Sequence, residues 1–347
     1  MIARRLHIAR MLKNPKKCSY FLIEHPSEPI IIPLSIFITS LSTFINLIGF
    51  YVIVKKSKKE TRLFRFTLFG VQFSLWISQG FWAIFLNTLA FFPFPALSAN
   101  SFFGNDGSIH NLFYVWVLLL SIFAVFLVGQ LIVRHRMVVR HDSIFNFPRW
   151  FYIILLAGGW SVMISIILLA WTYCDSAEIA KFEYVRQNFP SCLKVFDLSG
   201  VLVITNVLAL YAMLGLMVIV GLGAESAYAV SSFLMLFELF KQTSKMSKNA
   251  FAHMKKVVVD TIVQILIKSL FISTWAFWIV ISYFVDKNVD TRAASTIINS
   301  LFVAAPIPGT ISMMVQNASY RKFITETILR RKRSEVNPYQ STLPGRL

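Results

Sequence analysis

The stretch LFYVWVLLLSIFAVFLVGQLIV, residues Leu112–Val133, contains no charged side chain and decides the fold class. A helix needs about 20 apolar residues to cross the roughly 30 Å of hydrocarbon in a bilayer. The stretch shows no alternation of polar and apolar residues, so it does not fit a strand of a membrane barrel. We therefore expect a membrane-spanning helix here.

Similar apolar runs occur on both sides of this one and give seven expected spans, at residues 30–54, 66–92, 112–133, 150–171, 201–240, 261–284 and 293–316. The fifth run is long for a single crossing, and Gly221, Gly223, Glu225 and Ser226 interrupt it. One long helix is the favoured interpretation because no polar loop lies near Gly223, and two spans joined by a tight turn are the alternative. The predicted fold is an all-α, polytopic seven-transmembrane helix bundle.

The composition supports a membrane protein and excludes several other classes. Of the 347 residues, 56% are hydrophobic and only 14% are charged, whereas a soluble domain carries about 25% charged residues. The net charge of +18 would suggest nucleic-acid binding in a soluble protein, but here we expect a lipid bilayer and no nucleic acid as partner. The 33 Phe, 14 Gly and three Cys exclude a disordered chain, a collagenous fibre and a disulfide-rich module.

The charges between the spans predict the orientation. The first, third and fifth loops and the C-terminal tail are basic, whereas the second, fourth and sixth loops are neutral or acidic. By the positive-inside rule the basic set faces the cytosol. We therefore expect an extracellular N-terminal tail at residues 1–29, a membrane domain at 30–316 and a cytoplasmic tail at 317–347, although the N-terminal tail is itself basic.

The fourth loop holds two of the three cysteines, Cys174 and Cys192. An oxidising exterior allows a bridge between them, which would stabilise the loop by about 3 kcal/mol on the chain-entropy model. The bridge is the favoured interpretation, and two free thiols are the alternative. Cys18 has no evident partner.

The stretch SYRKFITETILRRKR that follows the seventh span places apolar residues on one helical face, namely Tyr320, Phe323, Ile324, Ile328 and Leu329. Basic residues on the other face suit lipid headgroups, so we expect a short helix that lies along the inner leaflet. A disordered basic tail is the alternative.

Charged residues and prolines inside the spans are candidate switch elements. Glu225 and Lys268 can form a pair between neighbouring helices that biases two arrangements of the bundle. Alternatively, Lys268 reaches the inner interface and Glu225 lies in a wet crevice. Pro306 and Pro308, next to Gly309, predict a bend in the seventh span, which is either a hinge or a plain kink.

Aromatic residues in the outer half of the bundle are candidate ligand contacts. Trp275 and Trp278 in the sixth span, with Phe113 and Trp116 in the third, can line an apolar cavity. The alternative is that they face lipid or anchor the helices at the membrane interface. The sequence contains no GxxxxGK[ST], HExxH or GxSxG motif and no Cys/His set with zinc spacing. We therefore expect no enzymatic activity, no metal and no cofactor.

Three stretches in order carry a family resemblance: LAFFPFPALSANSFFG at 89–104, NFPSCLKVFD at 188–197 and PIPGTISMMVQNASYRKF at 306–323. Over about residues 30–325 the chain resembles the nematode serpentine seven-transmembrane chemoreceptors, most closely serpentine receptor class H (Srh) and its relatives in the Str superfamily. The resemblance implies a G-protein-coupled, olfactory-type chemoreceptor in the plasma membrane of sensory neurons. It also implies a small-molecule ligand and a heterotrimeric G protein as partners.

The resemblance suggests residues that face the G protein, and it also has gaps. The acidic-Asn-Arg motif of class H relatives is absent after the third span, where GQLIVRHRMVV stands, and Arg134 or Arg136 would substitute for its arginine. Tyr320 and Arg321 match the family's closing Tyr-Arg. A seven-span transporter or ligand-gated channel is the alternative function, and a structural or trafficking membrane protein is a third. A transporter should carry more polar residues near the midplane, and a channel with the opposite orientation would contradict the loop charges.

Overall fold

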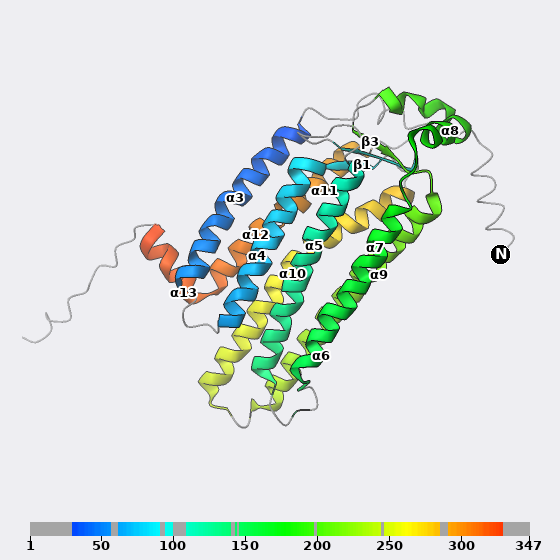
Figure 1. Cartoon of the computed structure of the whole chain (residues 1–347). Helices are drawn as coiled ribbons and strands as arrows, with labels where there is room; N and C mark the ends of the chain where they lie inside the picture. The colour runs from blue at the N-terminus through cyan, green and yellow to red at the C-terminus, as the bar shows by residue number, and fades with distance from the viewer. Residues whose placement is uncertain are drawn as a thin grey trace, which may run out of the picture.

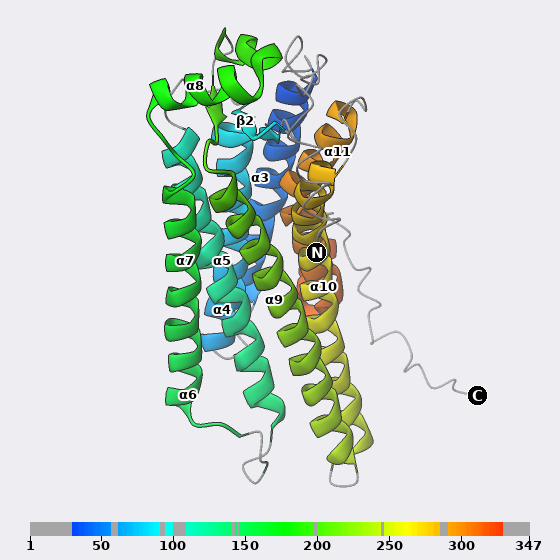
Figure 2. The same cartoon turned by 90° about the vertical axis from the view of Figure 1, so that its right-hand side faces the viewer.

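The structure is a computed structural model that describes residues 30–56, 62–90, 94–99, 109–139, 143, 146–197, 200–243, 246–284 and 291–328. In these residues the chain forms seven long helical segments that run side by side (Figures 1 and 2). They are α3 (Ile31–Lys56), α4 (Arg62–Phe81) with η2 (Trp82–Leu86), α5 (Ile109–Val138), α6 (Arg149–Ile154) with η3 (Leu155–Gly159) and α7 (Trp160–Thr172), α9 (Val207–Lys241), α10 (Lys248–Phe284), and α11 (Arg292–Ala304) with α12 (Pro306–Gln316).

The lengths of these helices fit a membrane protein. Six segments in the described part of the chain are long and apolar enough to cross a bilayer. The remaining segment, α9, has 35 residues in one continuous helix, which at 1.5 Å per residue is roughly 50 Å long. The chain is therefore an all-α membrane bundle, and the fifth apolar run is one helix rather than two.

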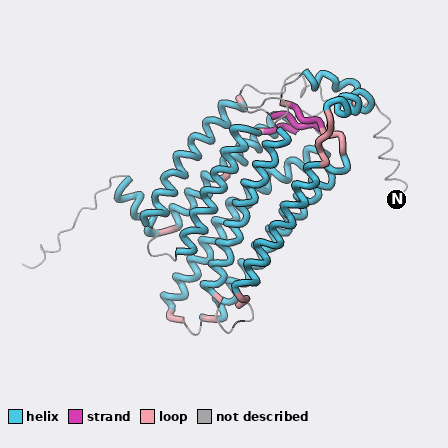
Figure 3. The backbone as a smooth tube through the Cα atoms, viewed as in Figure 1, coloured by secondary structure: helices cyan, strands magenta, loops and turns pink. Residues whose placement is uncertain are grey.

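A small antiparallel sheet lies at one end of the bundle, which we call the sheet end (Figure 3). Its strands are β1 (Thr88–Ala90), β2 (Ala96–Ala99) and β3 (Val201–Val203), with Leu97 paired to Leu202. The helix α8 (Glu178–Asn188) and the 3-10 helix η4 (Pro190–Asp197) lie beside the sheet.

The sheet shortens two of the expected spans. The second span ends at Leu86 rather than at residue 92, because Asn87 adopts a left-handed backbone with φ of 38°. The fifth begins at Val207 rather than at residue 201, because Val201–Val203 pairs with β2. Asn206 caps this helix, and its side-chain oxygen accepts a hydrogen bond from the Ala209 N–H at 3.1 Å.

Close packing and buried polar contacts hold the helices together. A Cβ on Gly70 of α4 would overlap the ring of Phe126 on α5, so the two helices approach closely only because this residue is glycine. The Thr310 hydroxyl of α12 donates to Asn46 Oδ1 of α3 at 2.7 Å and also lies 3.2 Å from Gln72 Oε1 of α4. These buried contacts join three spans.

The seventh span is interrupted at Ala305, between α11 and α12, as the prolines predict. Pro306 is the first residue of α12, and the Ala305 N–H instead donates to the Phe302 carbonyl at 3.2 Å. After α12 the chain continues as α13 (Ala318–Phe323) and η6 (Ile324–Ile328). The expected tail helix is thus present as far as Ile328, and residues 329–333 lie outside the described residues.

Candidate functional site

A cavity of about 250 Å³ lies inside the bundle, between α5, α7, α9, α10 and α11. Most of its lining is aliphatic or aromatic, which is typical of sites that bind small molecules. The lining residues are Trp116, Val117, Leu120, Ser121, Phe123, Ala124, Leu127, Trp160, Ile164, Ile167, Val218, Leu222, Glu225, Tyr228, Ser269, Ile272, Ser273, Trp275, Ala276, Phe277 and Phe302.

Aromatic rings that pack against one another cover the cavity on the side of the sheet end. Trp82 lies against Trp116 with the ring centroids 4.6 Å apart, and against Trp275 at 4.9 Å. Trp275 in turn stacks on Phe302 at 4.8 Å. All four rings are buried. Because these rings come from the second, third, sixth and seventh spans, any movement between the spans must rearrange them.

A chain of hydrogen bonds fixes the orientation of Trp275. Its indole Nε1 donates to Asn299 Oδ1 at 3.0 Å, and the Asn299 side-chain nitrogen donates to the Thr88 carbonyl at 3.0 Å. Thr88 is the first residue of β1. The wall of the cavity is therefore connected directly to the sheet, through α11.

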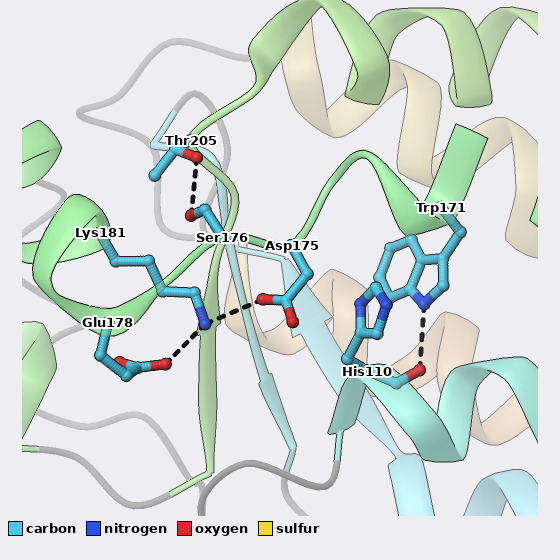
Figure 4. A network of polar contacts seen from close by, with 7 residues as sticks. All are labelled: His110, Trp171, Asp175, Ser176, Glu178, Lys181 and Thr205. Carbon is cyan, nitrogen blue, oxygen red and sulfur yellow. Dashed lines mark hydrogen bonds and ion pairs between the residues drawn. The ribbon is translucent and has the colours of Figure 1, made fainter. Parts of the chain in front are cut away.

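A second aromatic layer, formed by His110, Phe113 and Trp171, lies at the sheet end of α5 and α7. Phe113 stacks on Trp171 with the ring centroids 4.2 Å apart. The His110 ring also stacks on Trp171, with the centroids 5.0 Å apart (Figure 4). The Trp171 indole Nε1 also donates to the His110 carbonyl at 3.0 Å. This layer packs the connection between α7 and α8 onto the bundle.

Ionic and polar contacts hold that connection in place (Figure 4). The Lys181 ammonium of α8 lies 3.0 Å from Asp175 Oδ1 and 2.6 Å from Glu178 Oε1. The Thr205 hydroxyl donates to Ser176 Oγ at 2.8 Å and joins the connection to the segment that enters α9. The chain between α7 and α9 is thereby held over the sheet end of the bundle.

The electrostatics of this cluster favour the charged forms. Burial by itself raises the pKa of the Asp175 carboxyl. This effect is outweighed by the hydrogen bond and charge of Lys181, by the Ser176 backbone hydrogen bond and by the charge of His110. The pKa of Asp175 therefore lies below its ordinary value. Burial likewise lowers the pKa of Lys181, but its hydrogen bonds to Glu178 and Asp175 leave that pKa above its ordinary value. The Lys181–Asp175 pair is thus ionised at neutral pH.

Glu225 contributes a carboxylate to the cavity. Its Oε1 accepts a hydrogen bond from the Ser273 hydroxyl of α10 at 3.2 Å. Tyr228, one turn further along α9, lines the same cavity. Among the lining residues that the structure describes, Glu225 alone carries a formal charge.

Some residues that line the cavity on α9 and α10 are also exposed on the surface of the bundle. Two of them, Leu222 and Phe277, are 53% and 50% exposed. Both lie within membrane-length helices, so this surface faces lipid. The sheet end, in contrast, is covered by the buried rings of Trp82, Trp116 and Trp171.

Two of the four expected ligand contacts lie in the cavity. Trp116 and Trp275 line it, as the sequence predicts. Phe113 instead stacks on Trp171, and the Trp278 indole donates to Ser295 Oγ of α11 at 3.0 Å, so neither lines the cavity. Their predicted place in the lining is therefore wrong, because both side chains make contacts between helices instead.

The expected pair of Glu225 and Lys268 does not form. Glu225 accepts its hydrogen bond from Ser273, and the Lys268 ammonium is fully buried with no hydrogen-bond partner among the described residues. The Lys268 side chain instead packs against α12, where its Cε lies 3.0 Å from the position that a Cβ on Gly309 would take. Glu225 of α9 is thus bonded to Ser273, whereas Lys268 of α10 packs beside Gly309 of α12.

The expected Cys174–Cys192 bridge is also wrong. Cys174 carries a free, buried thiol, and Cys192 is disulfide-bonded. Burial, with the nearby charge of Asp175, raises the pKa of the Cys174 thiol to about 11. Cys174 lies two residues after α7 and packs in the core cluster of Trp171, whereas Cys192 belongs to a separate cluster. Cys18 lies outside the described residues.

The residues expected to face a G protein differ in exposure. Arg136 and Arg321 are exposed. Arg134 is half-buried, with its guanidinium carbon 3.4 Å from the centre of the Phe64 ring. Tyr320 is 1% exposed and packs in the core with α3 and α4, so its expected role as a surface contact is corrected to a packing role.

The sequence reasoning missed several aromatic residues of the site, among them three large rings. Trp82 and Phe302 complete the ring cluster, and Trp160 of α7 lines the cavity. Each lies within an expected span, but apolar runs without marked periodicity do not tell which face of a helix points inward. In the described residues no group of three His, Cys, Asp or Glu side chains is placed to hold a metal ion.

Comparison with known proteins identifies the family. Residues 26–324 match the family model of the serpentine type 7TM GPCR chemoreceptor Sri. No curated protein matches the chain. The match supports a nematode serpentine receptor and does not confirm the likeness to class H. Because the match covers all seven helical segments and the cavity between them, the chain belongs to the serpentine type seven-transmembrane GPCR chemoreceptor family Sri.

Proposed function

We propose that this protein is an olfactory-type chemosensory receptor that binds a small molecule in the cavity between α5, α7, α9, α10 and α11, and signals to a heterotrimeric G protein. The observation that carries the proposal is the position of the cavity, which five helical segments share. A ligand in this position touches several spans at once. It can therefore favour one arrangement of the spans over another, which is the condition for a conformational response.

The seventh helical segment offers a direct route from ligand to bundle. Phe302 lines the cavity and lies in the last turn of α11, three residues before the break at Ala305. Its carbonyl accepts the hydrogen bond of the Ala305 N–H. A ligand that displaces the Phe302 ring thus acts next to the bend at Pro306, and the bend transmits the change to α12 and α13.

We further propose that the sheet end faces the exterior and that the receptor lies in the plasma membrane of a sensory neuron. Two independent features support this orientation. The loops opposite the sheet end are the basic ones, as expected for the cytosolic side. Cys192, next to α8, is disulfide-bonded, and disulfides persist in oxidising compartments. Epitope tags at both termini, detected with and without permeabilisation, test the orientation.

A reporter assay tests the function. The receptor is expressed with a calcium or cyclic-nucleotide reporter and exposed to an odorant panel. We expect Trp275→Ala to reduce the response to an active compound at equal surface expression, since Trp275 lines the cavity. Trp278→Ala is the matched control, because this ring lies outside the cavity on the same helix. An unchanged response in Trp275→Ala would refute this binding site.

A further inference from the structure

We propose that the cavity selects small amphipathic cations and places a single protonated amine against the carboxylate of Glu225. The inference rests on the proposed ligand-binding function and names the chemical class of the ligand. It follows from three properties of the cavity, which are its charge, its aromatic lining and its exposed lining residues.

The described lining of the cavity holds one carboxyl group and no basic side chain. Glu225 is the only formally charged residue among its described lining residues, and the hydrogen bond that it accepts comes from the neutral Ser273 hydroxyl. An ionised carboxylate offers about four acceptor positions, so this one has capacity left for a donor in the cavity. A lone charge at membrane depth is costly, and a cationic ligand would offset that cost by pairing with it.

The aromatic lining suits the same class of ligand. Trp116, Trp160 and Trp275 come from three different helices and surround the cavity together. The indole face attracts an ammonium group, and the interaction is stronger where water is excluded. The rest of the lining is largely aliphatic, so the remainder of the ligand must be apolar.

The exposed part of the lining gives such a ligand a way in from lipid. The cavity is covered on the side of the sheet end, and its lining residues Leu222 and Phe277 are exposed toward the bilayer. An amphipathic amine partitions into the membrane, where its apolar part can pass between α9 and α10. A carboxylic acid would meet the like charge of Glu225 at low dielectric, so it is rejected.

A binding experiment with matched probes tests the selection. The purified receptor in lipid nanodiscs is heated with 2-phenylethylamine, 2-phenylethanol or 3-phenylpropanoic acid, which share a ring and differ in charge. A ligand that binds only the folded protein raises the melting temperature. We expect the amine to bind at least about tenfold more tightly than the alcohol, as for a hydrogen bond to a charged group, and the acid to give no shift.

Two variants on α9 assign the effect to the carboxylate. Glu225→Gln should lose the amine shift, and Glu225→Asp, which keeps the charge, should retain it. Glu238→Gln is the matched control, because Glu238 lies on the same helix and accepts its hydrogen bond from Ser143 at 2.8 Å, outside the cavity. The alcohol binding as tightly as the amine, an amine shift that survives in Glu225→Gln, or no amine shift in the wild type would each overturn the proposal.

The outcomes also separate this inference from the proposed function. If neutral odorants bind the cavity and activate the reporter while amines do not, the receptor function stands and the cationic class is wrong. If amines bind through Glu225 but no compound activates any reporter, the selectivity stands and the signalling function is wrong.

Discussion

Replacement of Lys268 by methionine should stabilise this protein. Lys268 is fully buried in α10, and its ammonium has no hydrogen-bond partner among the described residues. A lysine near the centre of a membrane helix costs about 2.5–3.5 kcal/mol on insertion scales. Methionine has a similar length, is unbranched and can fill the same space beside Gly309 without a charge. We expect Lys268→Met to raise the free energy of unfolding by about 3 kcal/mol.

The expected shift in melting temperature is large enough to measure. At roughly 2 °C per kcal/mol for a chain of this size, the variant should melt roughly 6 °C above the wild type. Cys174 provides the readout, since its thiol is buried and its pKa is raised to about 11 by burial. A thiol-reactive dye therefore stays dark with the folded receptor and reacts once α7 and its aromatic layer unfold.

A matched control and a clear counter-result make the test decisive. Lys248→Met changes an exposed lysine at the start of the same helix and should leave the melting temperature within about 1 °C of the wild type. If Lys268→Met melts at or below the wild-type temperature, the ammonium contributes a favourable interaction. The reasoning from its burial and lack of partners would then be refuted.

Two further predictions concern packing and pH. Gly70→Ala should lower the melting temperature by forcing the Phe126 ring out of place, at a cost of about 1–3 kcal/mol, whereas Gly80→Ala, which meets nothing within 4 Å on the same helix, should be neutral or stabilising. The stability that Asp175 contributes should be complete above its ordinary pKa of 3.8 and disappear as the pH falls through its lower folded pKa. The difference between wild type and Asp175→Asn in thermal melts should therefore shrink below about pH 4; a difference that stays constant to lower pH would contradict the pairing with Lys181.

The candidate site was only partly predictable from residue types. Trp116 and Trp275 were proposed as lining residues because of their place in the outer half of the bundle, and both line the cavity. Phe113 and Trp278 had the same sequence signal but make contacts between helices instead. Nothing in an apolar run specifies the rotation of its helix, so the sequence could not separate the two kinds of aromatic residue.

The cysteines show the same limit. Their loop placement made a bridge between Cys174 and Cys192 reasonable, but a disulfide needs the two Cβ atoms within about 4.5 Å. The aromatic layer at the end of α7 holds Cys174 in the core as a free thiol, while Cys192 is disulfide-bonded. Which cysteines form a disulfide depends on the distance between their Cβ atoms in the folded chain. The spacing of the cysteines along the sequence does not give that distance.

The sequence by itself determined that this chain is a bundle of membrane helices. The length and hydropathy of each run are local properties, and they suffice to decide whether a segment can cross a bilayer as a helix. It also determined the break at Pro306, since proline removes a helical hydrogen bond wherever it stands. Only the tertiary structure decided that the rings of Trp82 and Phe302 join one cluster and that Glu225 faces a cavity. It also decided that the Lys268 ammonium has no hydrogen-bond partner among the described residues. These are relations between helices distant in sequence, and they depend on how each helix is rotated and packed against its neighbours.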